Sequence, residues 1–177
     1  KRLQVFDPYE HSLYTFGSFP EMDILEENDI YKSDVFMAFL NVNPQRTHYV
    51  LAHAYVDMIE IYNNESNLVK RLRGPDYFFP MVKAKELPSG GTMVVPMREA
   101  KMGYTIPRVD STSLYVLFNG KSASHHDYHL NRIFSFDLTG NPQTLYTLDI
   151  PIFAFDIDFN KGVIYGLTHE MGIGDSE

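Results

Sequence analysis

Apolar and polar positions alternate in short runs along this chain of 177 residues, and the runs end at Gly, Pro, Asn or Asp. Short alternating runs rich in Val, Ile, Tyr and Phe, closed by turn residues, are typical of β-strands. One pattern occurs three times: an apolar pair, an aromatic residue, an Asp or Asn, a turn, a second apolar strand and a proline. The three copies run from Leu3 to Pro20, from Ile59 to Pro75 and from Ile133 to Pro151.

The strands predicted from this pattern group into units of four, joined by turns short enough to make each unit an antiparallel meander. The clearest unit has its strands at residues 104–109, 114–118, 132–137 and 144–148. A second unit has them at residues 35–42, 49–55, 58–62 and 68–72. The N-terminus supplies only the last two places (3–7 and 13–16), and the C-terminus only the first two (152–158 and 163–167).

Repeated four-stranded meanders predict an all-β fold, a β-propeller, because each blade must bury an apolar face against its neighbours. The two incomplete ends add up to one blade, so about three blades are present, whereas closed rings have roughly four to eight. We therefore expect part of a larger ring, and treat both termini as cut. The predicted divisions are residues 1–20 (end of a blade), 31–75 (blade), 76–103 (insertion), 104–151 (blade) and 152–177 (start of the next blade). An irregular β-sandwich is the alternative, but it would not require a repeated phrase.

Two segments interrupt the regular spacing. Residues 21–34 are acidic, and residues 76–103 carry the turn sequence Pro88-Ser-Gly-Gly91 between apolar strings. Loops this long are often functional in a compact domain. The Gly-Gly pair is equally consistent with a plain additional hairpin.

The charge balance disfavours a nucleic-acid partner. The formal net charge is −8, from 23 acids against 15 Lys and Arg, whereas phosphate binding needs a concentrated basic surface. The chain has no cysteine, which excludes a disulfide framework and a thiolate metal site. No apolar run is long enough to span a bilayer.

The densest polar cluster is His125-His126-Asp127-Tyr128-His129. Imidazole and carboxylate groups bind Zn, Ni or Cu, and His125, Asp127 and His129 converge on an extended segment, where side chains alternate. These three residues are the metal candidates. A solvated, His-rich hairpin tip is the favoured alternative, because no second cluster supplies a fourth ligand.

Other motifs carry less chemistry. Asp156, Asp158 and Asn160 alternate like calcium ligands, but they lack the bidentate Glu of an EF-hand loop, and a strand closed by an Asn-Lys-Gly turn is the preferred interpretation. No nucleophile elbow, phosphate-binding loop or zincin motif is present. We therefore predict no cofactor.

Three side chains on or beside the first strands of their units are candidates for ligand binding. Tyr104, Arg108 and His53 could reach a central channel and bind a sugar or an anion by stacking and bidentate contacts. The alternative, which we favour, is that they fill the core with their polar atoms satisfied.

The phrases at residues 113–121, 131–141, 145–151 and 155–167 resemble the TolB-like six-bladed β-propeller family of Bacteroides-type bacteria. The resemblance is strongest over residues 104–168 and corresponds to the C-terminal half of such a ring. It implies an exported, lipid-anchored envelope protein, periplasmic or on the cell surface, which meets the membrane only through an upstream anchor. It implies no catalytic residue, because the motif residues are structural.

The sequence therefore predicts a non-enzymatic binding or interaction propeller whose partner is a protein or a carbohydrate. The ligand would lie at the channel mouth or at the two inserted segments. The alternative is a propeller hydrolase or lyase that acts on a carbohydrate or a small ester at the central channel. Such an enzyme would need groups from several blades to converge on one point.

Overall fold

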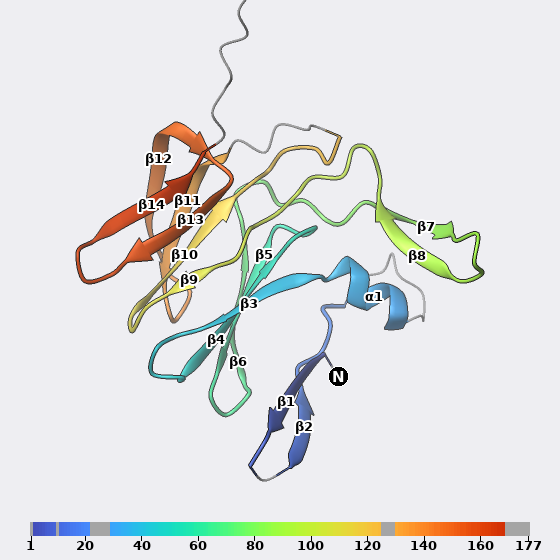
Figure 1. Ribbon diagram of the computed structural model, residues 1–177, viewed down its shortest axis with the longest axis horizontal. Coiled ribbons are helices and arrows are strands. Elements are labelled where there is room, and N and C mark those ends of the chain that lie inside the picture. Colours follow the sequence, from blue (N-terminus) through green and yellow to red (C-terminus); the bar gives the residue numbers. More distant parts are fainter. Residues whose placement is uncertain (1, 10, 22–28, 125–129, 169–177) are drawn as a thin grey trace, which may run out of the picture.

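Two four-stranded antiparallel sheets form the centre of the molecule (Figure 1). The computed structural model describes residues 2–9, 11–21, 29–124 and 130–168. In both sheets the strands follow one another in chain order, as expected for propeller blades. The first sheet contains β3 (Ala38–Val42), β4 (His48–His53), β5 (Met58–Asn63) and β6 (Leu68–Arg73). The second sheet contains β9 (Arg108–Val109), β10 (Ser113–Phe118), β11 (Leu130–Asp137) and β12 (Pro142–Ile152).

Three two-stranded hairpins accompany the sheets. One hairpin precedes the first sheet and another follows the second sheet, as predicted for the two incomplete ends. Over the residues that the structure describes, the sheets do not close into a ring. The hairpins are β1 (Leu3–Asp7) with β2 (Ser12–Phe16), β7 (Val82–Glu86) with β8 (Thr92–Pro96), and β13 (Ala154–Asp158) with β14 (Val163–Leu167).

In three units, an Asn or Asp at the end of the first strand or directly after it holds the following turn. Asn43 Oδ1 accepts the backbone N–H groups of Thr47 and His48, and Asp110 Oδ1 accepts those of Thr112 and Ser113. Asp158 Oδ1 does the same for two backbone N–H groups at 3.1 Å. Carboxylate and amide oxygens suit this role because they mimic a backbone acceptor. These turns fix which positions of the three units are equivalent.

The first strands differ from the prediction at their starts. A strand from residue 35 was expected, but α1 (Asp29–Val35) ends there, and Val35 and Phe36 pack against Val56 and Met58. In the second sheet the ladder begins only at Arg108, and Tyr104 forms an isolated bridge to Phe118. Apolar residues at these two sites fill a core without lying in a strand, which hydrophobic alternation alone does not distinguish.

The largest core lies between the two four-stranded sheets. Ile59 and Ile61 of the first sheet meet Leu114, Val116 and Phe118 of the second in one buried cluster. A second cluster joins β10 and β11 to the β13–β14 hairpin. Each unit therefore buries its apolar face against the next unit along the chain, as propeller blades do.

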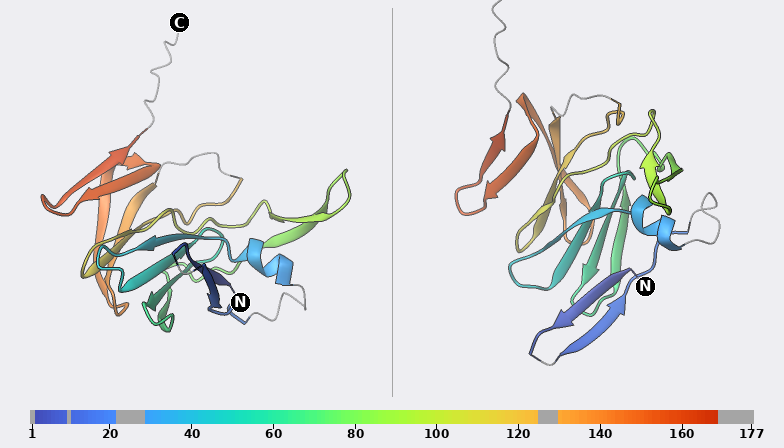
Figure 2. Two further views of the ribbon diagram at one scale, coloured as in Figure 1. Left: turned by 60° about the horizontal axis from the view of Figure 1, so that its bottom comes forward. Right: turned by 45° about the vertical axis from the view of Figure 1, so that its right-hand side comes forward.

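The insertion at residues 76–103 contains the β7–β8 hairpin, which extends away from the four-stranded sheets (Figure 2). Its turn contains Gly90 and Gly91, both at positive φ (79° and 102°), a conformation that glycine adopts without strain. Val82 and Val94 pack beside Phe36 near α1. No described helix is long and apolar enough to cross a membrane.

Candidate functional site

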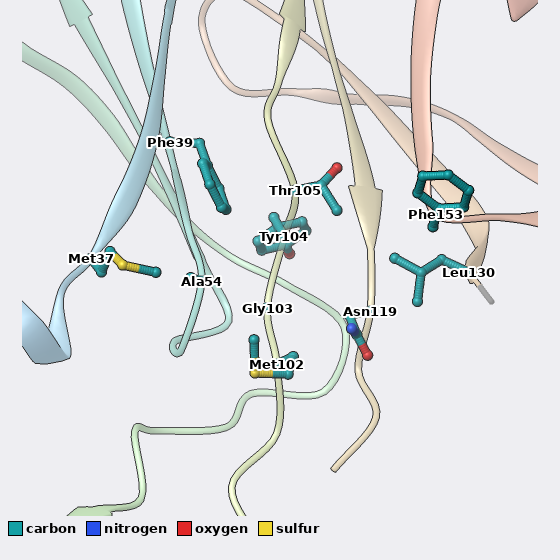
Figure 3. A pocket seen from close by; sticks show the side chains of 10 residues that line it. All are labelled: Met37, Phe39, Ala54, Met102, Gly103, Tyr104, Thr105, Asn119, Leu130 and Phe153. Carbon is teal, nitrogen blue, oxygen red and sulfur yellow. The ribbon is translucent and has the colours of Figure 1, made fainter. Parts of the chain in front are cut away.

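A pocket of about 390 Å³ opens where the first strands of successive units face one another (Figure 3). Met37 and Phe39 come from the start of the first sheet, and Leu130 and Phe153 come from the second sheet and the link to β13. Met102, Tyr104 and Asn119 complete its wall. The lining is mostly apolar, which is the usual character of a small-molecule or side-chain binding site.

A smaller hollow of about 210 Å³ continues this pocket toward β9 and β13. It shares Phe39, Thr105 and Phe153 with the first pocket and adds Arg108 and Phe155. We call the two together the inner groove. Its walls come from three consecutive units, so the groove exists only when the units are assembled.

Three equivalent positions on the first strands hold a polar residue, and one of these residues, Arg108, lines the inner groove. Asn41, Arg108 and Asp156 each lie two residues before the Asn or Asp that ends a first strand. Asn41 Nδ2 donates to the Pro107 carbonyl at 2.7 Å, and Arg108 Nε donates to Asp156 Oδ1 at 2.8 Å. The three units are thus joined by a row of polar contacts, which we call the inner polar row.

The charge of Arg108 is only partly enclosed. Its guanidinium lies 5.6 Å from the centre of the Phe155 ring, within the range of a cation–π contact. The pKa of Asp156 is lowered, first by the backbone N–H of Ile157 and then by Arg108. Because Asp156 is largely exposed, a ligand with its own anionic group could displace it from Arg108.

Tyr104 forms the wall of the groove with its ring, and its hydroxyl points into the protein. The hydroxyl donates to Asp57 Oδ1 at 2.7 Å, and Asp57 Oδ2 accepts the backbone N–H groups of Asp76 and Tyr77 at 2.8 Å. Burial and the nearby charge of Asp57 raise the pKa of Tyr104. The phenol is therefore a neutral donor, and Asp57 is fully engaged.

Two glycines allow this close packing between units. A Cβ on Gly74 would collide with the Asp57 carboxylate and the Tyr104 hydroxyl, and a Cβ on Gly103 would collide with the carbonyl oxygens of His53 and Val56. Gly103 N–H also donates to the Ala54 carbonyl at 2.7 Å. Glycine is the residue that permits such an approach of backbone to its surroundings.

His53 lies in a buried charge cluster. This cluster is on the opposite face of the first sheet from the core that the two sheets share. His53 Nε2 is 3.3 Å from Glu60 Oε2, and Arg71 Nη2 lies 2.8 Å from Glu60 Oε1. Arg2, which precedes β1, pairs with Glu60 and donates from Nη2 to the Phe36 carbonyl at 2.9 Å. We call these four side chains, Arg2, His53, Glu60 and Arg71, the charge cluster.

The charge cluster holds His53 neutral. Burial, together with the positive charges of Arg2 and Arg71, lowers the pKa of His53 to about 4, against the opposing effect of Glu60. Burial alone would raise the pKa of Glu60, but the hydrogen bond from His53 and the charge of Arg2 lower it to about 2. A neutral His53 that donates from Nε2 leaves Nδ1 as an acceptor, and this buried atom has no partner among the described residues.

The predicted ligand residues thus lie in two places. Tyr104 and Arg108 line the inner groove, while His53 is fully buried in the charge cluster. Ligand binding by these residues stays a prediction. Residues 125–129, with the metal candidates His125, Asp127 and His129, lie outside the described residues. Within the part of the chain that the structure describes, no group of three or more metal-ligating side chains occurs.

Sequence reasoning missed Asn41, Phe39 and Phe153, and it considered Asp156 only as a calcium ligand. A usable signal was present, because Asn41-Val-Asn43, Arg108-Val-Asp110 and Asp156-Ile-Asp158 share one spacing. Alignment of the units on the turn residue would have placed all three polar side chains at one level. The aromatic wall has no such signal, since it depends on how neighbouring units pack.

These features define the class: a β-propeller assembled from four-stranded blades, with a groove on the inner side of successive blades. Residues 11–160 match the model of the TolB-like 6-blade propeller-like family, and the chain belongs to that family. The all-β propeller prediction is confirmed, and the sandwich alternative is set aside. Comparison with curated proteins and with solved structures found no match.

Proposed function

We propose that this propeller is a non-enzymatic binding module whose ligand, a protein or a carbohydrate, occupies the inner groove. The supporting observation is the groove itself, which three consecutive units build from apolar side chains beside an accessible Arg108. Aromatic and methionine side chains with one guanidinium provide affinity by burial and orientation by charge.

Two buried acids, Asp57 and Glu60, and the buried His53 are engaged in contacts within the protein. Asp57 accepts three hydrogen bonds, from Tyr104, Asp76 and Tyr77, and Glu60 is paired with two arginines. Both side chains are fully buried. This arrangement supports binding over the alternative hydrolase or lyase, which requires convergent, accessible acid and base groups.

The cellular setting belongs to the same proposal. The resemblance to propellers of Bacteroides-type bacteria supports a place in the cell envelope, with this chain as the C-terminal half of a ring and a lipid anchor upstream. The formal net charge of −8 supports a partner other than nucleic acid.

Site-specific photo-crosslinking tests the groove. A photoreactive phenylalanine analogue at Phe39, introduced into the protein in its producing cell, is expected to yield a discrete crosslinked species. The matched control is the same analogue at Leu145, an exposed position on β12 outside the groove. Identical products at both positions, or no product at Phe39, would contradict the proposal. Turnover of 4-nitrophenyl acetate that Phe39→Gln abolishes would instead favour an enzyme.

A further inference from the structure

The β7–β8 hairpin of the insertion is a two-stranded sheet with two different edges. Among the described residues, β7 and β8 pair only with each other. β8 packs beside α1 (Figure 1), so β7 is the outer strand. A sheet of only two strands is marginally stable in water unless a helix or a further strand covers it. The outer strand is therefore the place where a third strand would add stability.

The backbone of β7 presents an open edge of three residues. Met97 N–H donates to the Met81 carbonyl at 2.8 Å, just before β7 begins. Because the direction of the backbone groups alternates along an antiparallel strand, the odd-numbered residues of β7 bond to β8. The even-numbered residues point their N–H and C=O groups away from β8, and these residues are Val82, Ala84 and Glu86.

The outer edge of β8 is blocked by comparison. By the same alternation, the even-numbered residues of β8 point away from β7, and one of them is Pro96, which has no N–H to donate. Proline on an edge strand hinders pairing with a further strand. β7 contains no proline between Val82 and Glu86. The β7 edge is therefore the one that can accept another strand.

The odd-numbered side chains of β7 form a basic row with apolar ends. Lys83 and Lys85 lie on the face opposite Val82, whose side chain packs on the core near α1. Both lysines are exposed, and neither pairs with an acid among the described residues. Met81 and Leu87 flank the strand and continue the row, 45% and 38% exposed.

We propose that the β7 edge binds an extended acidic segment of a partner protein, which adds a third strand to the hairpin. Backbone hydrogen bonds to the open edge supply affinity, and alternate side chains supply selectivity. An acid opposite each of Lys83 and Lys85 forms a cross-strand ion pair. An apolar residue at each end of the segment covers Met81 or Leu87. The recognised pattern is apolar, acid, acid, apolar at alternate positions.

The two lysines also exclude other strands. Lysine on an edge strand protects against chance pairing, and it rejects a second copy of β7 because like charges would lie opposite one another. An acidic strand turns this repulsion into attraction. Residues 81–97 hold two lysines and one glutamate in a chain with a net charge of −8, so the attraction is local to the hairpin. This site is separate from the inner groove, and its failure would leave the groove proposal unchanged.

Two capped peptides of equal composition test the proposal with the unmodified chain. Val-Thr-Glu-Thr-Glu-Thr-Val places both acids on one face of an extended strand and reads the same in both directions. Val-Thr-Glu-Glu-Thr-Thr-Val places them on opposite faces. Fluorescence anisotropy of the labelled peptides should show saturable binding of the first. The second should bind about fivefold more weakly, because only one of its acids can face a lysine.

Substitutions on the two edges separate strand addition from simple charge attraction. Ala84→Pro removes an outward N–H of β7 without breaking a bond to β8, and it should abolish binding of the first peptide. Thr92→Pro makes the same change on the outer edge of β8 and should leave binding unchanged. Lys83→Gln combined with Lys85→Gln should weaken binding about tenfold. Lys70→Gln, at an exposed lysine of β6, should leave the affinity unchanged.

Four results would overturn the proposal. Equal affinity for the two peptides, or no saturable binding of either, would exclude an acidic strand at β7. Binding that survives Ala84→Pro, in a variant with an unchanged melting temperature, would place the peptide elsewhere. Vesicles containing phosphatidylglycerol that bind through Lys83 and Lys85, with no peptide binding, would assign the lysines to a membrane surface. Failure of the complete ring to bind the peptide, where the chain of 177 residues does, would show that another segment of the same protein pairs with β7.

Discussion

The two four-stranded sheets fill one pair of equivalent positions with opposite chemistry. In the first sheet these positions hold His53 and Glu60, whereas in the second they hold Phe118 and Phe134. The first pair faces Arg2 of the preceding hairpin. The second pair packs edge to face at 5.7 Å, and Phe118 also meets Tyr104. The blade framework thus fixes the place of the side chains and leaves their chemistry open.

The difference matters for how each sheet is held to the unit before it. The first sheet meets the β1–β2 hairpin at the charge cluster, which we call the polar junction, and the second sheet meets the first at these rings, which we call the aromatic junction. In the charge cluster two arginines surround the carboxylate of Glu60, whose side chain is fully buried. The stability of the polar junction therefore depends on every partner being present. The aromatic junction depends on contact area, and its loss leaves a cavity but no uncompensated charge. The polar junction should therefore be the more fragile of the two.

The strongest test removes one residue from each junction. Glu60→Ala should lower the free energy of unfolding by roughly 4 kcal/mol, because it leaves the nearly buried Arg2 and the partly exposed Arg71 without their anion. Phe134→Ala, at the equivalent position, should cost about 3 kcal/mol because Phe134 is only partly buried. Urea denaturation of both variants measures the difference. Glu86→Ala, at an exposed position on β7, is the control, and equal losses for Glu60 and Phe134 would refute the comparison.

Acid should weaken the polar junction selectively. The pKa of His53 is about 4 in the folded chain and 6.5 when unperturbed, so the unfolded state binds a proton more readily. The contribution of neutral His53 to the free energy of unfolding is complete above pH 6.5. It declines as the pH falls toward 4, by roughly 3 kcal/mol in total.

Denaturation midpoints between pH 7 and pH 4.5 provide the measurement. In His53→Gln, whose amide can still donate to Glu60, the decline should be largely absent over this interval. His48→Gln, which changes a histidine at the start of β4, should retain it. An unchanged pH profile in His53→Gln would show that another group titrates.

The smallest expected effect tests the hydrogen bond from Tyr104 to Asp57, next to the aromatic junction. Tyr104→Phe removes the donor to Asp57 Oδ1 but leaves both backbone donors to Oδ2. The loss should be about 1–2 kcal/mol, the usual cost of a buried acceptor without its partner. Thermal unfolding beside Tyr14→Phe, at an exposed ring, provides the reference. A change no larger than that of Tyr14→Phe would show that Asp57 needs only its backbone donors.

The sequence predicted the blades well because their signals are local. The alternation of apolar and polar residues predicted the strands. Turns follow at Asn43, Asp110 and Asp137, whose side-chain oxygens accept hydrogen bonds from nearby backbone N–H groups. The groove was predicted only in part. Arg108 and Tyr104 were placed beside the channel, but Tyr104 bonds to Asp57, 47 positions away, and His53 meets Arg2, 51 positions away. No local pattern encodes such distant pairs.

The short helix was missed for a related reason. Val35 and Phe36 have the composition of a strand, yet they are buried against Val56 and Met58 at the end of α1. Tertiary packing there outweighs the alternation of the next few residues. The same competition shortened β9, where Tyr104 serves the core in place of a continuous ladder.

The insertion between the sheets leaves and re-enters the fold at one point. Asp57 holds the backbone of Asp76 on the outward path, and Lys101 Nζ binds the Asp76 carboxylate at 2.9 Å on the return. These contacts join the two ends of the insertion outside the hairpin, so the length of the hairpin does not alter the spacing of the blades. Closing a longer loop costs little free energy. A Cβ added at Gly90 or Gly91 would meet nothing within 4 Å, and this turn lies at the far end of the hairpin from the contacts at Asp76, so we expect a reporter domain grafted there to leave the propeller intact.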